Sequence, residues 1–108
     1  MCAYEVYQLK HDIDNYEYLL FESLKRLEKH GYKVESTNYK KVYEGNLDIG
    51  VNISGLDVCE ELFKKFNMNK PVDFRGHSMS VSDVVVLSKD GTRTAYYCDD
   101  HGFTTISF

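Results

Sequence analysis

The sequence lacks several features that would assign it to a class. It has no excess of positive charge, because 13 lysines and arginines stand against 17 aspartates and glutamates, a net charge of −4. This composition disfavours a nucleic-acid partner, which is usually held by a positive field. No apolar run approaches the roughly 18 residues of a membrane-spanning helix, and no basic segment followed by an apolar one marks an export signal. We therefore expect a cytoplasmic protein.

Cysteine and proline are scarce. The three cysteines, Cys2, Cys59 and Cys98, are odd in number and widely spaced, which indicates reduced thiols rather than a disulfide framework. Pairs of the C-x-x-C or H-x-x-x-H kind, which structural zinc sites usually contain, are missing. With 43% hydrophobic residues, the 108-residue chain can bury a core without a metal or a disulfide. We expect one domain, residues 1–108, with no cofactor.

The C-terminal third has the pattern of a β-meander. A β-branched run at residues 84–87 is followed by Asp90-Gly91, the pair that type I′ hairpin turns prefer. This pattern predicts a return strand over residues 93–98. A second turn at residues 99–102 then leads into a third strand over residues 103–108.

Helical and strand-like segments precede the meander. Residues 3–9 alternate with the period-two pattern of a half-buried strand. A helix is predicted over residues 14–30, because Asp14 and Glu17 have the spacing of a capping box, leucines recur at helical spacing, and Gly31 follows. Between Tyr32 and Ile53 the strand-like residues are separated by polar ones. We expect one or two short strands there.

A second helix is predicted over residues 55–66. Ser54 and Asp57 have the spacing of a cap, and an apolar stripe marks the face that packs on a sheet. Pro71 closes this helix, and a loop follows over residues 73–82, anchored by its apolar side chains. The fold class is therefore α+β: a single small domain with two helices packed on one mainly antiparallel β-sheet that ends in a C-terminal β-meander.

Two stretches resemble a known family. The run from Phe66 to Leu87 reads F-N-x-x-x-P-x-D-F-x-G-H-S-x-S-V-S-D-V-V-V-L, and A-Y-Y-C-D-x-x-G-F follows it from Ala95. Both resemble the YodL-like domain family, as does the first predicted strand. The resemblance implies a small bacterial domain, found alone or within multidomain proteins of conjugative elements and phages, often near antirestriction modules. It offers no catalytic residues to transfer, and Asp100-His101 departs from the serine and aromatic residue that relatives more often have.

Two loops carry candidate chemistry. Gly76-His77-Ser78 and the run from Cys98 to His101 place histidines beside hydroxyls, a thiol and carboxylates. Nucleophilic catalysis needs a base within hydrogen-bond reach of a nucleophile, and adjacency in sequence does not provide that geometry. A metal site built from His77, Cys98, Asp99 and His101 lacks paired ligand spacing. We expect neither an enzyme nor a metalloprotein.

A nucleic-acid-binding accessory domain remains the alternative function. Residues 25–41 carry six basic and two acidic side chains, and they lie near Tyr32, Tyr39 and Tyr43, which we expect to be exposed and able to stack on RNA or single-stranded bases. The simpler interpretation is that these charges only solvate the surface.

The preferred function is a non-enzymatic protein-binding module of a mobile genetic element or phage, acting on a host factor such as a defence nuclease. A long loop in a compact domain is usually functional, and a free C-terminal strand can accept a partner strand. The predicted partner-binding residues belong to the loop and to the second turn of the meander: Phe74, Arg75, Gly76, His77, Ser78, Asp99, Asp100 and His101.

Overall fold

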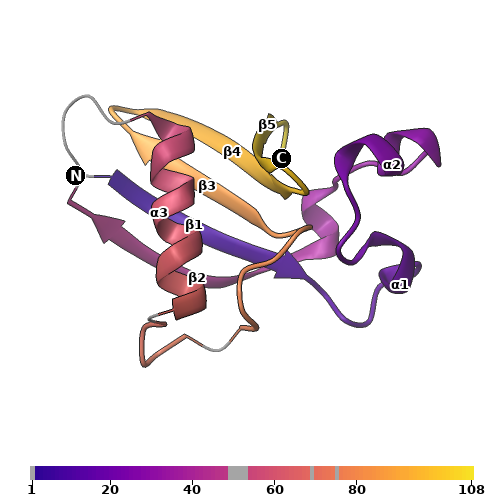
Figure 1. Cartoon of the computed structure of the whole chain (residues 1–108), viewed down its shortest axis with the longest axis horizontal. Coiled ribbons are helices and arrows are strands. Elements are labelled where there is room, and N and C mark those ends of the chain that lie inside the picture. The colour runs from indigo at the N-terminus through magenta and orange to yellow at the C-terminus, as the bar shows by residue number, and fades with distance from the viewer. Residues whose placement is uncertain (1, 49–53, 69, 75) are drawn as a thin grey trace.

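The computed structural model describes residues 2–48, 54–68, 70–74 and 76–108. Five antiparallel strands form one sheet in the order β2-β1-β3-β4-β5 (Figure 1). The predicted α+β class with a C-terminal meander is confirmed. The strands are β1 (Cys2–Leu9), β2 (Tyr39–Leu47), β3 (Val84–Lys89), β4 (Thr92–Asp99) and β5 (Gly102–Ile106).

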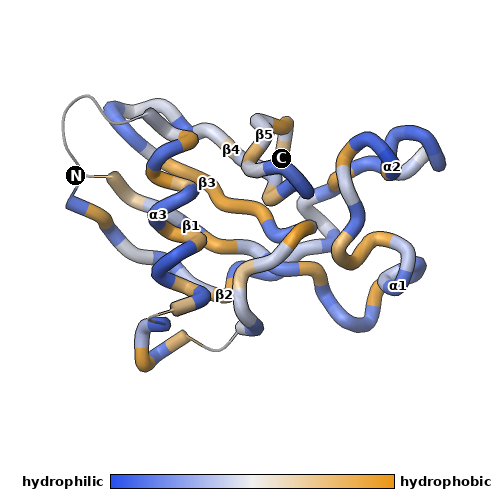
Figure 2. Tube along the Cα trace, in the orientation of Figure 1, coloured by the Kyte–Doolittle hydropathy of each residue, from blue (hydrophilic) through white to orange (hydrophobic). Residues whose placement is uncertain are grey.

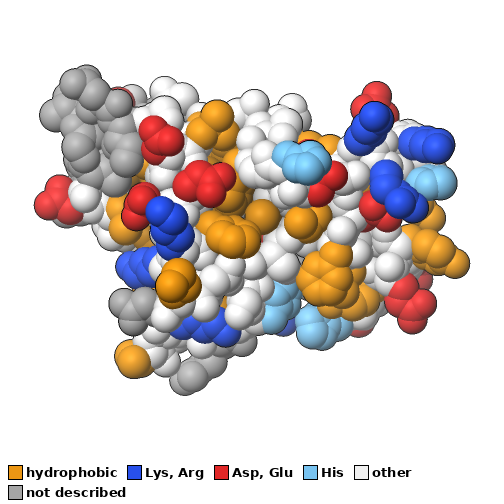
Figure 3. All heavy atoms as spheres, viewed as in Figure 1, with side chains coloured by type: hydrophobic (Ala, Val, Ile, Leu, Met, Phe, Trp, Pro, Cys, Tyr) orange, Lys and Arg blue, Asp and Glu red, His pale blue; other side chains and the backbone are white. Residues whose placement is uncertain are grey.

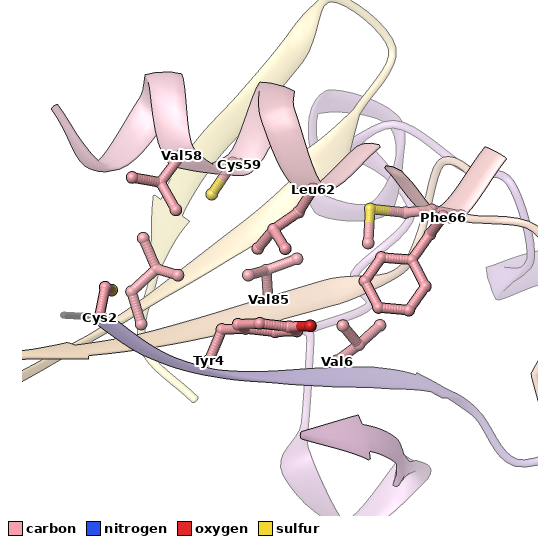
Figure 4. Close-up of a cluster of buried hydrophobic side chains, with 10 residues drawn as sticks. Cys2, Tyr4, Val6, Val58, Cys59, Leu62, Phe66 and Val85 are labelled. Atoms are coloured by element: carbon pink, nitrogen blue, oxygen red, sulfur yellow. The ribbon is translucent and has the colours of Figure 1, made fainter. Parts of the chain in front are cut away.

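One helix covers one face of the sheet. This helix, α3 (Gly55–Met68), contains the predicted segment and begins where the Ser54 hydroxyl accepts a hydrogen bond of 3.2 Å from the Asp57 N–H. Its apolar stripe points at the even-numbered residues of β1 and at β3 (Figure 4). The buried contacts include Val58, Cys59, Leu62 and Phe66 of the helix and Tyr4, Val6 and Val85 of the sheet.

The β3–β4 hairpin has the predicted turn. Asp90 and Gly91 both adopt positive φ, 51° and 79°, which is the signature of a type I′ turn. Lys89 and Thr92 form the closing pair. The two-residue turn sets the register, so Val85 and Leu87 face α3 while Val84 and Val86 face the other side.

The prediction of a single helix over residues 14–30 is wrong. Two short helices, α1 (Tyr16–Leu19) and α2 (Leu24–Lys29), form an arm that projects beyond one end of the sheet (Figure 1). The helical backbone is interrupted at Phe21, whose φ is 61°. Ser23 caps α2 by accepting from the Arg26 N–H, whereas the cap of α1 is Asn15 and not Asp14.

Tertiary hydrogen bonds explain the break, because they satisfy backbone groups that a continuous helix would have bonded internally. The Tyr97 hydroxyl donates to the Glu22 carbonyl at 2.6 Å, and the Leu24 N–H donates to Asp99 Oδ1 at 3.2 Å. Because the helix is interrupted between α1 and α2, Leu19 and Leu27 can both pack into the apolar cluster on the second face of the sheet. Gly31 follows α2 with a positive φ of 78°.

The second face of the sheet carries its own apolar cluster. Figure 2 shows hydrophobic residues concentrated on β3 and a largely hydrophilic α2. Phe108 covers part of this face, with its ring 5.1 Å from that of Tyr7 and 5.4 Å from that of Tyr39. The sheet members of this cluster are Leu9, Tyr39, Val84, Val86, Ala95 and Tyr97.

Residues 32–48 contain one long strand, preceded by a 3-10 turn over Ser36–Asn38. The strand-like residues between 49 and 53 lie outside the described part of the chain. The three tyrosines expected to be exposed are not: Tyr39 is 7% exposed, and Tyr32 and Tyr43 are partly buried. The Tyr43 ring lies 5.4 Å from that of Phe66. No helix in the described residues is long and apolar enough to span a bilayer.

Candidate functional site

The predicted site residues fall into two groups at one end of the sheet. The loop residues precede β3, and the turn residues join β4 to β5. Ser82 links the two segments, because its N–H donates to the Cys98 carbonyl at 3.0 Å. The two groups nevertheless have different surroundings.

The loop is fastened to the sheet by Gln8, which is 1% exposed. Its Nε2 donates to the His77 carbonyl at 2.8 Å and to Asp83 Oδ2 at 3.0 Å. Its Oε1 accepts from the His77 N–H at 3.2 Å. Gln8 occupies an even position of β1, where Tyr4 and Val6 are apolar. That break in the pattern was the available sequence signal, and it was missed.

Gly76 and Phe74 complete this attachment. A Cβ on Gly76 would lie 2.4 Å from Gln8 Oε1 and 2.9 Å from the Phe74 ring, so only glycine lets the loop approach this closely. The Phe74 ring packs edge-on against Phe66 of α3 at 4.8 Å. Phe74, Gly76 and His77 therefore hold the loop in place. Ser78 is exposed, and Arg75 lies outside the described residues.

Among the described residues, the hydrogen-bond contacts of the His77 ring include no hydroxyl or thiol. Its Nδ1 lies 2.7 Å from the Ser78 carbonyl, and because a carbonyl only accepts, this contact places a proton on Nδ1. Its Nε2 points toward Asp83 Oδ1 at 4.0 Å. Both ring nitrogens are thus directed at loop and sheet-end atoms rather than at a hydroxyl.

Asp83 is a fully buried carboxyl group. Oδ2 accepts from Gln8 and, at 3.0 Å, from the Ser80 N–H, while Oδ1 has no hydrogen-bond donor among the described residues. Burial raises the pKa of Asp83 to about 7, and the bonds from Gln8 and Ser80 oppose part of that rise. A buried acid that holds its proton near neutral pH stabilises the loop without an unpaired charge.

Asp99 has a structural partner, whereas its two neighbours point outward. Asp99 Oδ1 accepts from the first N–H of α2 and from the Asp100 N–H at 2.9 Å. The side chains of Asp100 and His101 are 56% and 95% exposed, with His101 Nε2 3.9 Å from Asp100 Oδ2.

The turn borders a groove of about 380 Å³, which we call the β5 groove. Phe63 of α3 and Phe103 of β5 line it, with their rings 6.3 Å apart and nearly perpendicular. Figure 3 shows acidic and hydrophobic side chains over one part of α3, with basic side chains beside them further along the helix and a second basic group over α2. The groove is lined by Glu60, Phe63, Val81, Cys98, Asp99, Asp100, His101, Gly102 and Phe103.

The three cysteines are buried free thiols. Burial raises the pKa of Cys59 to about 12 and that of Cys98 to about 12, so neither is a ready nucleophile or metal ligand. No three His, Cys, Asp or Glu side chains in the described chain lie close enough together to hold a metal ion. The set considered from the sequence, His77, Cys98, Asp99 and His101, is therefore not assembled.

Comparison with known families agrees with this fold. A family model described as the YodL-like domain matches residues 3–108. The chain belongs to the YodL-like domain family. Neither the curated proteins nor the solved structures include a match to this YodL-like domain.

Proposed function

We propose that this YodL-like domain is a non-enzymatic protein-binding module, and that the β5 groove receives an apolar side chain from a partner protein. The groove itself carries the proposal. Its volume of about 380 Å³ lies within the range of small-molecule and side-chain pockets. Aromatic walls from Phe63 and Phe103 with a polar rim match the usual anatomy of a protein interface.

The turn residues predicted from the sequence line this groove, and Val81 is the loop residue in its described lining. Asp100 and His101 lie on the rim of the groove, while Val81, at the end of the loop, forms part of its wall. The attachment of the loop through Gln8 keeps that wall in one position. A fixed wall lowers the conformational entropy lost when a partner binds.

The absence of catalysis is part of the proposal. His77 and Ser78 do not form a base–nucleophile pair, and burial keeps the thiols of Cys59 and Cys98 protonated. In the genomic setting that the family resemblance implies, the partner would be a host protein, such as a defence nuclease. The domain would block this partner by binding one of its segments.

Nucleic-acid binding is the second candidate, and one observation favours it. Tyr18 and Phe21 on the arm are 66% and 60% exposed, and the basic residues of α2, Lys25, Arg26 and Lys29, follow them in the chain. Exposed aromatic rings beside basic side chains can hold single-stranded bases. Substitution of Lys25 and Lys29 by glutamate would abolish salt-dependent RNA binding if this candidate were correct.

Matched variants of α3 test the protein-binding proposal. Proteins captured from a bacterial lysate would be purified, and their affinity measured by calorimetry for the wild type, Phe63→Ala and Leu56→Ala. Leu56 is exposed on the same helix but lies outside the groove. We expect Phe63→Ala to weaken binding at least ~10-fold and Leu56→Ala to change it less than ~2-fold. Equal affinities for all three proteins would rule out the groove as the binding surface.

A further inference from the structure

The two edges of the sheet differ in how they are protected. The β2 edge carries Lys40, Lys41 and Glu44, the charged residues that natural edge strands use to prevent pairing with other chains. The β5 edge has the sequence GFTTI, with no charge and no proline. Its outward backbone groups face no further strand of the described sheet. Of the two edges, β5 is therefore the one able to accept another strand.

The β5 groove lies next to this open edge. Phe103 belongs to β5 and contacts Phe63 of α3, so the groove runs between the edge strand and the helix. A strand added to β5 would place alternate side chains on the α3 side of the sheet, where the groove is. The backbone of such a strand would pair with β5, and one side chain would enter the groove.

The groove has an acidic lining. Glu60, Asp99 and Asp100 line it, and no lysine or arginine is among its described lining residues. Glu60 reaches over the turn, since its Oε1 lies 3.6 Å from the position of a Cβ on Gly102. Asp99 is already bonded to α2 and to Thr104, which leaves Glu60 and Asp100 to interact with a ligand.

From these observations we infer that the partner contributes an extended, lysine- or arginine-bearing segment that adds to β5 as a sixth strand. This inference rests on the proposed function and gives it a binding mode and a partner chemistry. Backbone pairing provides affinity, an apolar side chain fills the groove, and basic side chains two positions away, on the same face of the added strand, pair with Glu60 and Asp100. A second copy that pairs β5 with β5 is disfavoured, because residues 102–108 bring no basic side chain to these carboxylates.

Charge-matched peptides and variants test the side-chain part. Fluorescein-labelled peptides of about nine residues would be titrated by fluorescence anisotropy. One face of each peptide carries a central valine flanked at every second position by lysine or by glutamate, and threonine fills the positions between. We expect only the lysine peptide to bind. The double variant Glu60→Gln, Asp100→Asn should weaken binding at least ~10-fold. The control Glu17→Gln, Glu28→Gln removes the same number of exposed carboxylates on the arm and should leave affinity within ~2-fold.

N-methylated peptides test strand addition. A strand pairs with an edge through every second backbone N–H. Methylation of one alternate set in the lysine peptide should therefore abolish binding, and methylation of the other set should not. The inference would be overturned if methylation of either set weakened binding equally. It would also be overturned if the arm control lost as much affinity as the Glu60→Gln, Asp100→Asn variant.

The outcomes also separate this inference from the proposed function. If the lysine peptide fails to bind while a purified partner still depends on Phe63, the binding mode is wrong and the protein-binding function stands. If the partner is insensitive to Phe63→Ala, the function itself fails. Analytical ultracentrifugation would show whether the domain forms a dimer. A dimer that Thr105→Lys dissociates would mean that a second copy of the chain occupies the β5 edge, and this too would overturn the inference.

Discussion

Gln8 Nε2 donates a hydrogen bond of 3.0 Å to Asp83 Oδ2, and so joins the end of the first strand to the residue just before the third. Both side chains are almost completely buried. The same amide group bonds both backbone polar groups of His77. One glutamine therefore fixes the position of the loop that forms part of the β5 groove.

Substituting Gln8 should destabilise the whole domain. Gln8→Leu keeps most of the volume but leaves buried groups of Asp83 and His77 without partners, so we expect a loss of about 2–4 kcal/mol in the free energy of unfolding. Urea denaturation would measure it. Ser78→Ala is the control, because Ser78 is exposed and the contact it makes uses its carbonyl. A loss below about 1 kcal/mol for Gln8→Leu would show that the network is dispensable.

Stability should fall as the pH rises through the titration of Asp83. Its pKa is raised from 3.8 to about 7 by burial, so between these values the folded protein keeps a proton that the unfolded chain has lost. The free energy of unfolding should therefore decrease across this window by up to about 4 kcal/mol and level off above it.

Asp83→Asn isolates this effect. The amide can accept from Gln8 and Ser80 with its oxygen and donate toward His77 Nε2 with its nitrogen. Denaturation at a series of pH values should give a flatter profile for the variant than for the wild type. If the two profiles run parallel, another group is responsible for the pH dependence.

The buried thiols should resist alkylation in the folded state. With pKa values of about 12, Cys59 and Cys98 are almost entirely protonated at pH 8. Mass spectrometry after iodoacetamide treatment should find both unmodified in native protein and fully modified in urea. Rapid labelling of Cys98 without denaturant would mean that the β4–β5 end opens readily.

Two glycine substitutions separate steric clash from backbone strain. Gly76→Ala would place a Cβ 2.4 Å from Gln8 Oε1, so we expect a loss of about 2 kcal/mol or more. Gly91→Ala meets no atom within 4 Å but must keep a φ of 79°, which costs about 1 kcal/mol. Thermal denaturation should rank the two in that order, and the reverse order would contradict the close contact of the loop with Gln8.

Tyr97→Phe should release the arm. The substitution removes the 2.6 Å hydrogen bond to the Glu22 carbonyl and keeps the buried ring. We expect a loss of about 1 kcal/mol and faster hydrogen exchange of the α2 amides, with β1 and β3 unaffected. Uniformly faster exchange would instead indicate that the arm and the sheet unfold as one unit.

Short-range sequence patterns predicted the elements whose structure depends on residues close together in the chain. The apolar stripe of α3 and its Ser54 cap, the Asp90-Gly91 turn and the order of the meander all follow from short-range patterns, and all are present. The same reasoning failed for the arm. The break at Phe21 is stabilised by Tyr97 and Asp99, which lie more than seventy positions away in the sequence.

The candidate site could be predicted only in part, for the same reason. The residues of the β4–β5 turn were identified from composition, but their neighbour Phe63 comes from a helix whose position over β5 is a tertiary property. Likewise, Gln8 interrupts an apolar pattern without indicating its partner. A buried polar residue can interrupt a periodic pattern, but the pattern does not show which distant residue it contacts.

The strand order has a consequence for how the domain folds. β1 lies in the interior of the sheet, with Tyr4 paired to Gly45 on one side and to Leu87 on the other. The β3–β4–β5 meander needs only short two-residue turns and can form within microseconds, whereas seating β1 requires closure of a loop that spans most of the chain. We expect refolding to be limited by the insertion of β1 between the β2 strand and a meander that has already formed.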